Sequence, residues 1–178
     1  VELYVFFMMV HMKSLDKNHL ISTGSEGKNS SNESMEIFER THKNKNIDYL
    51  TMHIWPKNWN WYKADDAEKT LPITLENAGK YIDEHVKVAN NLKRPIIIEE
   101  FGMPRADESL SDKTSVKNRD IFYDYIFGRV AESVAKKGPL QAANIWGYGG
   151  EGRAVNKDGH WNPGDPLTTD PPQEPQGL

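Results

Sequence analysis

The adjacent carboxylates Glu99 and Glu100 are the side chains of this sequence that are best suited to chemistry. They follow three consecutive isoleucines after Pro95, a run typical of a strand buried on both faces in a parallel sheet. Because successive strand residues point to opposite sides, one of the two acids is expected to face a given cavity. A carboxylate at the C-terminal end of such a strand lies where α/β barrels carry their chemistry. The alternative is a strand that ends in two solvated acids.

A second group of residues suited to ligand binding begins after His53. Three tryptophans and a tyrosine fall within eight residues, at Trp55, Trp59, Trp61 and Tyr62. Indole rings beside Lys and Asn suit a sugar, because the ring faces stack on C–H groups while the polar side chains bind hydroxyls. The alternative is a hydrophobic cluster beneath a long loop.

His53 and Trp55 share a strand face because they are two residues apart. A histidine near a strand end usually has a structural role, but beside Glu100 on a neighbouring strand it can share a proton or a hydrogen bond. The six histidines of the sequence do not have the spacing of metal ligands, so no metal is expected.

Two glycine-containing turns complete the candidate site. The first, TGSEG at residues 23–27, carries Glu26, which either hydrogen-bonds a substrate hydroxyl or caps the loop. This turn lacks the Lys-Ser/Thr pair of a phosphate-binding loop, so no nucleotide cofactor is expected. The second turn follows Trp146 and leaves an indole uncovered at a strand end.

Short apolar runs alternate with helical patterns and would position these residues. The expected strands are residues 19–23, 47–54, 95–101 and 142–146. The expected helices are residues 31–41, 75–92 and 116–135. This alternation predicts βα units and a parallel sheet. Because four such units are half of an eightfold barrel of about 250 residues, the chain is either part of a barrel or a small open α/β sheet.

Composition excludes several classes of protein. The chain has 178 residues, a net charge of −4 and no Lys/Arg stripe, which argues against a nucleic-acid partner. The apolar stretch at residues 4–10 is too short to cross a bilayer and follows Glu2 rather than a basic region. A buried helix is therefore expected there, and neither a membrane anchor nor a signal peptide is expected in this chain. The Pro-rich residues 170–178 are typical of an irregular connection.

The segments HLISTGSEG, IDYLTMHIWP, RPIIIEEFG and NIWGYGGEGR together resemble the C-terminal half of family 5 glycoside hydrolases, above all the endo-β-1,4-mannanase branch. The resemblance implies a (β/α)8 TIM barrel, with residues 1–178 as the C-terminal half of one catalytic domain that contains strands five to eight. It also implies a secreted or cell-surface parent protein that acts on β-mannan or glucomannan. A half barrel leaves two sheet edges unpaired, which predicts self-association.

The resemblance assigns roles to particular residues. The glutamate of the family's E-F/Y-G motif, which is the nucleophile, corresponds to Glu100. The histidine that ends strand six corresponds to His53, and the tryptophan that ends strand eight, a sugar platform, to Trp146. Many relatives have a tyrosine that hydrogen-bonds the nucleophile where this chain has Trp55, whose indole N–H donates but cannot accept. The further expected substrate-binding residues are Glu26, Trp55, Trp59 and Trp61.

A retaining glycosidase needs a second carboxyl about 5–5.5 Å from the first. In the family this acid/base glutamate precedes the part that the chain resembles. Glu26 and Glu151 are the other glutamates near expected strand ends, and the resemblance supports neither. The chain alone is therefore expected to be a poor catalyst. The alternative functions are a non-catalytic carbohydrate-binding module, a cellulase of the same family and a structural α/β domain.

Overall fold

The computed structural model describes residues 2–109, 111, 113–147 and 156–157 of the 178-residue chain. The helices are α1 (Glu2–Leu15), α2 (Met35–Thr41), α3 (Ala67–Leu92) and α4 (Lys117–Ala135). The strands are β1 (Leu50–Ile54), β2 (Ile96–Phe101) and β3 (Leu140–Ile145). Short 3₁₀ turns occupy Asn29–Ser31, Ala64–Asp66 and Ala106–Glu108.

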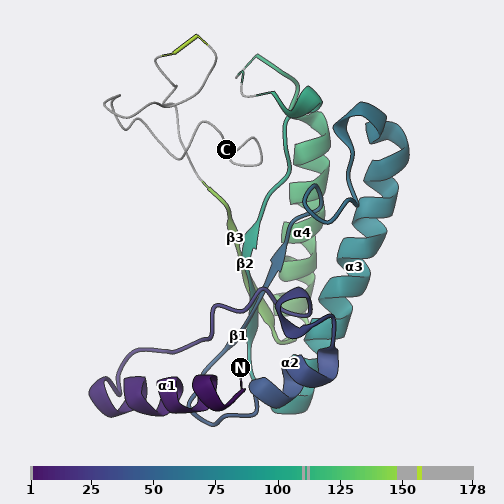
Figure 1. Ribbon diagram of the computed structural model, residues 1–178. Coiled ribbons are helices and arrows are strands. Elements are labelled where there is room, and N and C mark those ends of the chain that lie inside the picture. Colours follow the sequence, from purple (N-terminus) through teal and green to yellow (C-terminus); the bar gives the residue numbers. More distant parts are fainter. Residues whose placement is uncertain (1, 110, 112, 148–155, 158–178) are drawn as a thin grey trace. The chain divides into compact units, whose positions relative to one another are not determined.

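The three strands form one sheet in the order β1-β2-β3 (Figure 1). The Leu50 N–H donates to the Pro95 carbonyl at 2.9 Å, and the Ile96 N–H donates to the Pro139 carbonyl at 2.9 Å. Each strand therefore begins beside the beginning of its neighbour, as parallel strands joined by helical crossovers do. The prediction of α/β units with a parallel sheet is confirmed.

The chain divides into two compact units, which are described separately here. Unit 1 comprises Val1–Ile54, Gly79–Glu99 and Gly128–Ala143. Unit 2 comprises Trp55–Ala78, Glu100–Phe127 and Asn144–Leu178.

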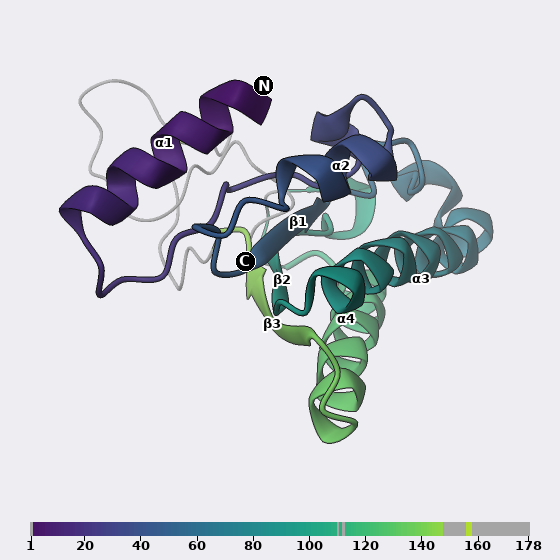
Figure 2. The same ribbon diagram turned by 90° about the horizontal axis from the view of Figure 1, so that it is seen from below.

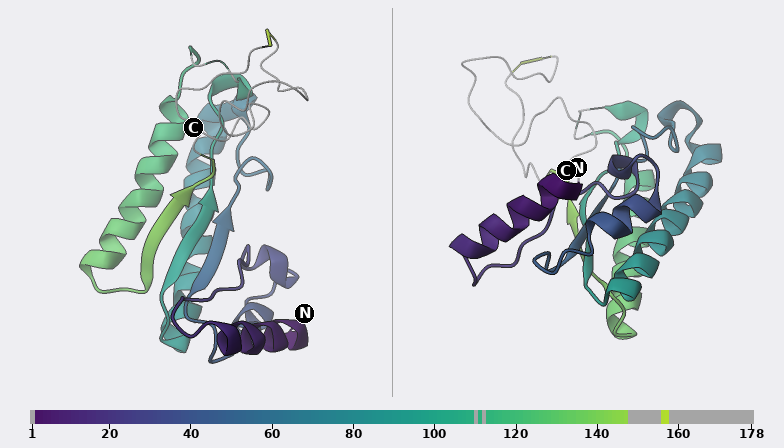
Figure 3. Two further views of the ribbon diagram at one scale, coloured as in Figure 1. Left: turned by 90° about the vertical axis from the view of Figure 1, so that its left-hand side faces the viewer. Right: turned by 60° about the horizontal axis from the view of Figure 1, so that its bottom comes forward.

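In unit 1, the segments of α3 and α4 lie on one face of the sheet (Figure 2, Figure 3). An ion pair between Arg129 and Asp83 joins the two helices. The hydroxyl of Ser34 accepts a hydrogen bond from the Ile37 N–H and so caps the start of α2. The fully buried apolar side chains of this unit include Phe38, Leu50, Met52, Ile54, Ile82, Ala89, Ile96 and Ile98.

The core of unit 2 is built around Phe101, the last residue of β2. Its fully buried ring packs edge-on against Phe122, Tyr123 and Phe127 of α4, with centroids 6.2, 5.2 and 5.6 Å apart. Aromatic burial of this size contributes several kcal/mol of stability. The anchored ring also fixes the backbone of the residue before it, Glu100.

The prediction of a strand at residues 19–23 is wrong. This segment is extended and lies along β1, but its contacts are intermittent. The Asp48 N–H donates to the Ile21 carbonyl at 2.8 Å, and the next backbone bond joins the His53 N–H to the Glu26 carbonyl at 3.1 Å. Between them, the Thr51 hydroxyl bonds the Ser25 carbonyl at 2.9 Å. A strand requires a continuous backbone ladder, which this spacing does not provide.

The apolar stretch at residues 4–10 is helical, but the prediction of burial is wrong. Leu3 and Tyr4 are each 69% exposed and Phe7 is 61% exposed, whereas Met9 is 7% exposed. A helix that is apolar all round can bury only the side that another element covers, and α2 packs on one side of α1. Within the described residues, no helix has both the length and the apolar character needed to cross a membrane.

The other helices agree with the sequence prediction in type and differ in extent. Helix α4 begins one residue from the predicted start and ends at the predicted residue, Ala135. Helix α3 begins at Ala67 rather than Leu75 and continues through Pro72. The Thr74 hydroxyl donates to the Thr70 carbonyl at 2.9 Å, a side-chain bond inside this first part of the helix.

Candidate functional site

In unit 1, the candidate site is formed by His53 on β1 and Glu99 on β2. The His53 Nε2 atom lies 3.1 Å from the Glu99 Oε2 atom, and the two side chains are 12% and 29% exposed. The sequence reasoning expected His53 to act beside Glu100; the carboxylate that the structure pairs with it is Glu99. Tandem acids at a strand end were the sequence signal for this position, but they did not reveal which acid meets the imidazole.

The turn at residues 23–27 lies close to this pair. A Cβ atom added at Gly24 would lie 3.8 Å from the Glu99 Oε2 atom. The Glu26 backbone is fixed on both sides, because its carbonyl accepts from the His53 N–H at 3.1 Å and from the Tyr81 hydroxyl at 2.7 Å. The half-buried Glu26 side chain is therefore carried by a rigid turn beside the His53–Glu99 pair.

His85 of α3 anchors the end of the same turn. Its Nε2 accepts from the Lys28 N–H at 2.9 Å, and its Nδ1 donates to the Tyr81 carbonyl at 2.7 Å. Burial lowers the pKa of His85 to about 4, so the ring is neutral with its proton on Nδ1. Burial raises the pKa of Tyr81, so its hydroxyl stays protonated and donates. The sequence analysis did not identify either residue, because side chains inside an amphipathic helical pattern are expected to belong to the hydrophobic core.

In unit 2, the candidate site is formed by Glu100 and two tryptophans. The backbone N–H of Trp146 donates to the Phe101 carbonyl at 3.0 Å, which places the end of β3 beside the end of β2. The Trp146 indole is 44% exposed and packs edge-on against Trp55, with ring centroids 6.2 Å apart. Glu100 is half-buried. A carboxylate and an exposed indole thus occupy neighbouring strand ends.

The pattern of burial along β2 departs from simple alternation. Ile98 and Phe101 are both fully buried although they are three residues apart, and Glu99 and Glu100 between them are both half-buried. The period of two, which predicted that the two acids face opposite sides, is therefore interrupted at the acids.

Trp59 and Trp61 pack on each other in the loop after β1. Their rings are 4.8 Å apart at an interplanar angle of 70°, and both side chains are half-buried. The Trp61 carbonyl accepts from the Thr74 hydroxyl at 2.9 Å, which ties the loop to α3. This geometry fits both the sugar platform and the hydrophobic cluster that the sequence allows.

Two expectations from the sequence remain: the roles of Glu151 and of the Pro-rich end, and the absence of a metal site. Glu151 and residues 170–178 lie outside the described residues. Among the residues that the structure describes, no three His, Asp or Glu side chains come together in a way that could hold a metal ion.

The parallel βα units, with a carboxylate and an exposed indole at neighbouring strand ends, are typical of an α/β protein that binds a sugar. A family model described as "GH family 5 beta-mannosidase-like" matches residues 4–178. The chain belongs to this family of glycoside hydrolases.

Proteins with similar sequences are named as mannan endo-1,4-beta-mannosidases. Mannan endo-1,4-beta-mannosidase 2 of Oryza sativa subsp. japonica is 28% identical over 169 residues, which cover 85% of this chain and 36% of that protein. Mannan endo-1,4-beta-mannosidase 3 of Arabidopsis thaliana is 30% identical over 176 residues, which cover 90% and 38%. The chain thus spans well under half the length of these relatives.

The fold also matches a solved structure. The glycoside hydrolase family 5 mannosidase from Rhizomucor miehei superposes with a TM-score of 0.84 at 30% identity, over 99% of this chain and 43% of that chain. An E202A mutant of that enzyme has been solved in complex with mannosyl-fructose, with the same score and identity. The partial parallel sheet with its helices is therefore half of a family 5 TIM barrel, as the sequence predicts.

Proposed function

We propose that the full-length protein is an endo-acting retaining glycoside hydrolase that cleaves β-1,4-mannosidic bonds in β-mannan or glucomannan. The family match over residues 4–178 carries this proposal. The names of the plant relatives support the linkage and the polymer. Because the chain spans less than half of those relatives, residues 1–178 are proposed to be the C-terminal half of a single catalytic domain.

Glu100 is proposed to be the nucleophile. In a retaining mechanism it attacks the anomeric carbon and forms a covalent glycosyl–enzyme, which water then hydrolyses. The backbone hydrogen bond from the Trp146 amide N–H to the Phe101 carbonyl supports this role, because it puts an exposed indole at the strand end next to the one that carries Glu100. The indole is proposed to stack on the sugar at the cleavage point.

The remaining roles follow from the resemblance and from local geometry. The second carboxyl, which protonates the leaving oxygen, is proposed to lie outside residues 1–178, so this chain alone is expected to turn over poorly. His53, held by Glu99, is proposed to hydrogen-bond the substrate. The other proposed substrate-binding residues are Glu26, Trp55, Trp59 and Trp61.

The decisive experiment is Glu100→Gln in the full-length protein, with release of reducing sugar from mannan as the readout. The substitution removes the nucleophilic oxygen and keeps the size of the side chain, so activity is expected to fall by at least about 10³-fold. Glu68→Gln on the exposed side of α3 is the control and should hydrolyse normally. Normal hydrolysis by the Glu100 variant would contradict the assignment.

A second candidate is exo-acting removal of terminal mannose. The description "beta-mannosidase-like" and the similarity to the Rhizomucor miehei mannosidase favour it. The products of mannohexaose separate the two candidates, because an endo-acting enzyme first releases a mixture of shorter oligosaccharides and an exo-acting enzyme first releases mannose.

The proposed substrate also bears on where the protein acts. Mannan is a polymer outside cells, so the full-length protein is proposed to be secreted or held at the cell surface. Detection of the native protein in the culture medium or on the cell surface would test this.

A further inference from the structure

Unit 2 contains a pocket that the proposed chemistry at the strand ends does not use. The pocket has a volume of about 530 Å³, within the range of about 300–1,000 Å³ that is typical of small-molecule sites. It is lined by Lys57, Asn60, Tyr62, Lys63, Ala64, Asp65, Asp107 and Glu108. We call it the Lys57–Glu108 pocket.

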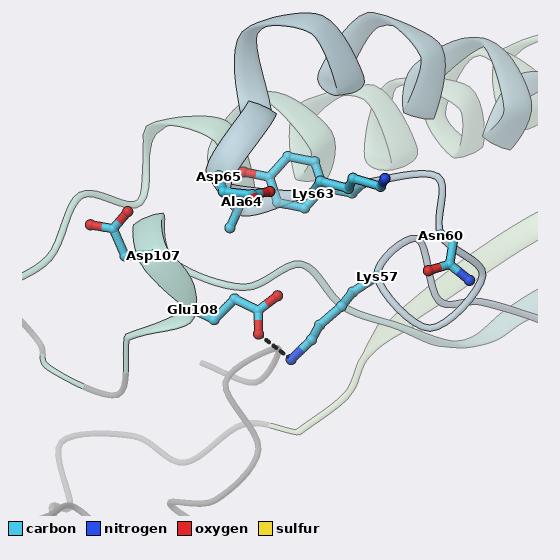
Figure 4. A pocket seen from close by; sticks show the side chains of 8 residues that line it. Lys57, Asn60, Lys63, Ala64, Asp65, Asp107 and Glu108 are labelled. Carbon is cyan, nitrogen blue, oxygen red and sulfur yellow. Dashed lines mark ion pairs between the residues drawn. The ribbon is translucent and has the colours of Figure 1, made fainter.

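An ion pair forms one side of this pocket. The Lys57 Nζ atom, from the loop after β1, lies 2.6 Å from the Glu108 Oε2 atom in the turn after β2. The two side chains are 31% and 39% exposed, so their polar groups remain accessible to a ligand. Lys63, Ala64 and Asp65 lie across from the pair (Figure 4).

The walls of the pocket are held in place by their own contacts. Tyr62 is 2% exposed, and its hydroxyl accepts from the Asn118 Nδ2 at 3.2 Å. The Lys63 N–H donates to the Thr70 hydroxyl at 3.1 Å. A site whose walls are already ordered loses less entropy when a ligand binds.

Three residues that line the pocket have an unusual backbone conformation. Asn60, Asp107 and Glu108 have φ angles of 57°, 56° and 52°, in the left-handed region that residues other than glycine rarely adopt. Such conformations store backbone strain and cluster at ligand clamps. Their concentration around one pocket supports a binding role for it.

The lining chemistry fits a neutral ligand rich in hydroxyls. Two ammonium groups and three carboxylates line the pocket, so neither sign of charge dominates. A sugar hydroxyl can accept from an ammonium and donate to a carboxylate at once, and charge-assisted hydrogen bonds of this kind are strong.

The pocket is also near the candidate site of the same unit. Lys57 follows Trp55 by two residues, so their Cα atoms are at most about 7 Å apart. The Trp55 indole packs against Trp146 at 6.2 Å. One oligosaccharide can therefore reach from the indole pair to the pocket.

We propose that the Lys57–Glu108 pocket is a distal subsite that binds a hexose unit of the oligosaccharide, away from the bond that is cleaved. Lys57 donates to its hydroxyls and Glu108 accepts from them. This inference rests on the proposed function and deepens it, because a distal subsite favours long substrates over short ones.

Calorimetric titration of the full-length protein with mannohexaose and mannobiose tests the subsite, with Glu100→Gln in every variant so that the ligands are not cleaved. Lys57→Met and Glu108→Gln are each expected to weaken mannohexaose binding about tenfold and to change mannobiose binding less than twofold. Lys69→Met is the matched control, because Lys69 is 80% exposed, pairs with Asp66 at 3.4 Å and does not line the pocket. It should bind both ligands as the parent chain does.

The outcomes separate this inference from the proposed function. If the parent binds mannohexaose and neither pocket variant weakens it, the subsite is refuted while the function stands. If the parent binds neither ligand, the proposed function fails and the subsite fails with it. Because Glu108→Gln is nearly isosteric, it keeps the test valid should Lys57→Met fold poorly.

Discussion

The His53 imidazole and the Glu99 carboxylate meet through Nε2 and Oε2, 3.1 Å apart, on neighbouring strands of unit 1. A neutral ring in this arrangement carries its proton on Nε2 and donates to Glu99, which leaves Nδ1 as an acceptor. Glu99 is therefore proposed to be a positioning residue that fixes the tautomer and orientation of His53. The two adjacent acids thus have separate proposed roles, Glu99 in positioning and Glu100 in attack.

The separate roles predict different costs for the two acids. In the full-length protein, Glu99→Gln is expected to lower kcat/KM on mannan about tenfold, since it weakens one hydrogen bond to a functional side chain. Glu100→Gln is expected to cost far more. Equal losses would contradict the separation of roles, and a larger loss at Glu99 would transfer the role of nucleophile to Glu99.

Buried histidines predict a loss of stability in acid. The folded state holds the pKa of His85 at about 4 and the pKa of His42 below 6.5, in both cases mainly through burial. The unfolded chain therefore binds protons more readily, so stability is full above about pH 6.5 and falls as the pH drops towards 4. At about 1.4 kcal/mol per pKa unit, His85 alone weakens the folded state by up to about 3 kcal/mol.

Denaturant unfolding at several pH values measures this effect. His85→Gln should be less stable at pH 7 but show a flatter dependence on pH. His11→Gln is the control, because its side chain is exposed on α1, and should leave the dependence unchanged. An identical pH slope in the parent chain and the His85 variant would contradict the assignment.

Gly27 is expected to tolerate no side chain. It has a φ of +97°, and an added Cβ would collide with the His85 imidazole and the Tyr81 hydroxyl. Gly27→Ala should therefore lower the free energy of unfolding by more than about 1 kcal/mol. Gly128→Ala in α4 is the matched control; no atom lies near its added Cβ, so it should stabilise the chain by about 0.5–1 kcal/mol. Thermal unfolding of both variants makes the comparison.

Trp146 is expected to contribute binding energy through its exposed ring. Trp146→Ala should weaken mannotetraose binding about tenfold, because it removes the apolar surface on which a sugar stacks. Trp146→Phe should retain affinity within about threefold, because it keeps an aromatic face. Calorimetric titration gives both values, and equal affinity of the alanine variant would argue against the platform.

The exposed face of α1 is expected to promote self-association at high concentration. Leu3 and Phe7 lie one helical turn apart and are 69% and 61% exposed. Light scattering should show the parent chain forming larger species, and a Leu3→Lys/Phe7→Lys variant should do so less. Glu36→Lys on α2 is the charge control, with a side chain that is 85% exposed, and should behave like the parent chain.

Much of the fold follows from periodicity in the sequence. The isoleucine run gave β2 within one residue of its observed bounds, and the apolar spacing in α4 identified that helix, because both signals come from continuous burial of one element. The segment at residues 19–23 has the composition of a strand, but a strand also depends on a partner backbone, which composition does not encode. The burial of α1 likewise depends on what covers it.

The candidate site was predictable in its residue types but only partly in its pairings. Glutamate, histidine and tryptophan at strand ends are visible in the sequence. Whether His53 meets Glu99 or Glu100 depends on strand register and on the interrupted alternation of β2, which the period of two does not capture. The ion pair between Lys57 and Glu108 joins loops 51 residues apart, and no local pattern marks such a pair.

Two side chains of α3 hold the turn that contains Glu26 and ends at Lys28, and this limits how the length of the turn can vary among related sequences. The Tyr81 hydroxyl holds the Glu26 carbonyl, and the His85 imidazole holds the Lys28 amide. These two side chains lie one helical turn apart on α3, so the length of backbone between their attachment points is set by the helix pitch. Inserting or deleting a single amino acid between Glu26 and Lys28 would break one of these two hydrogen bonds. Variation in the length of this turn should therefore be tolerated only together with a change at position 81 or 85.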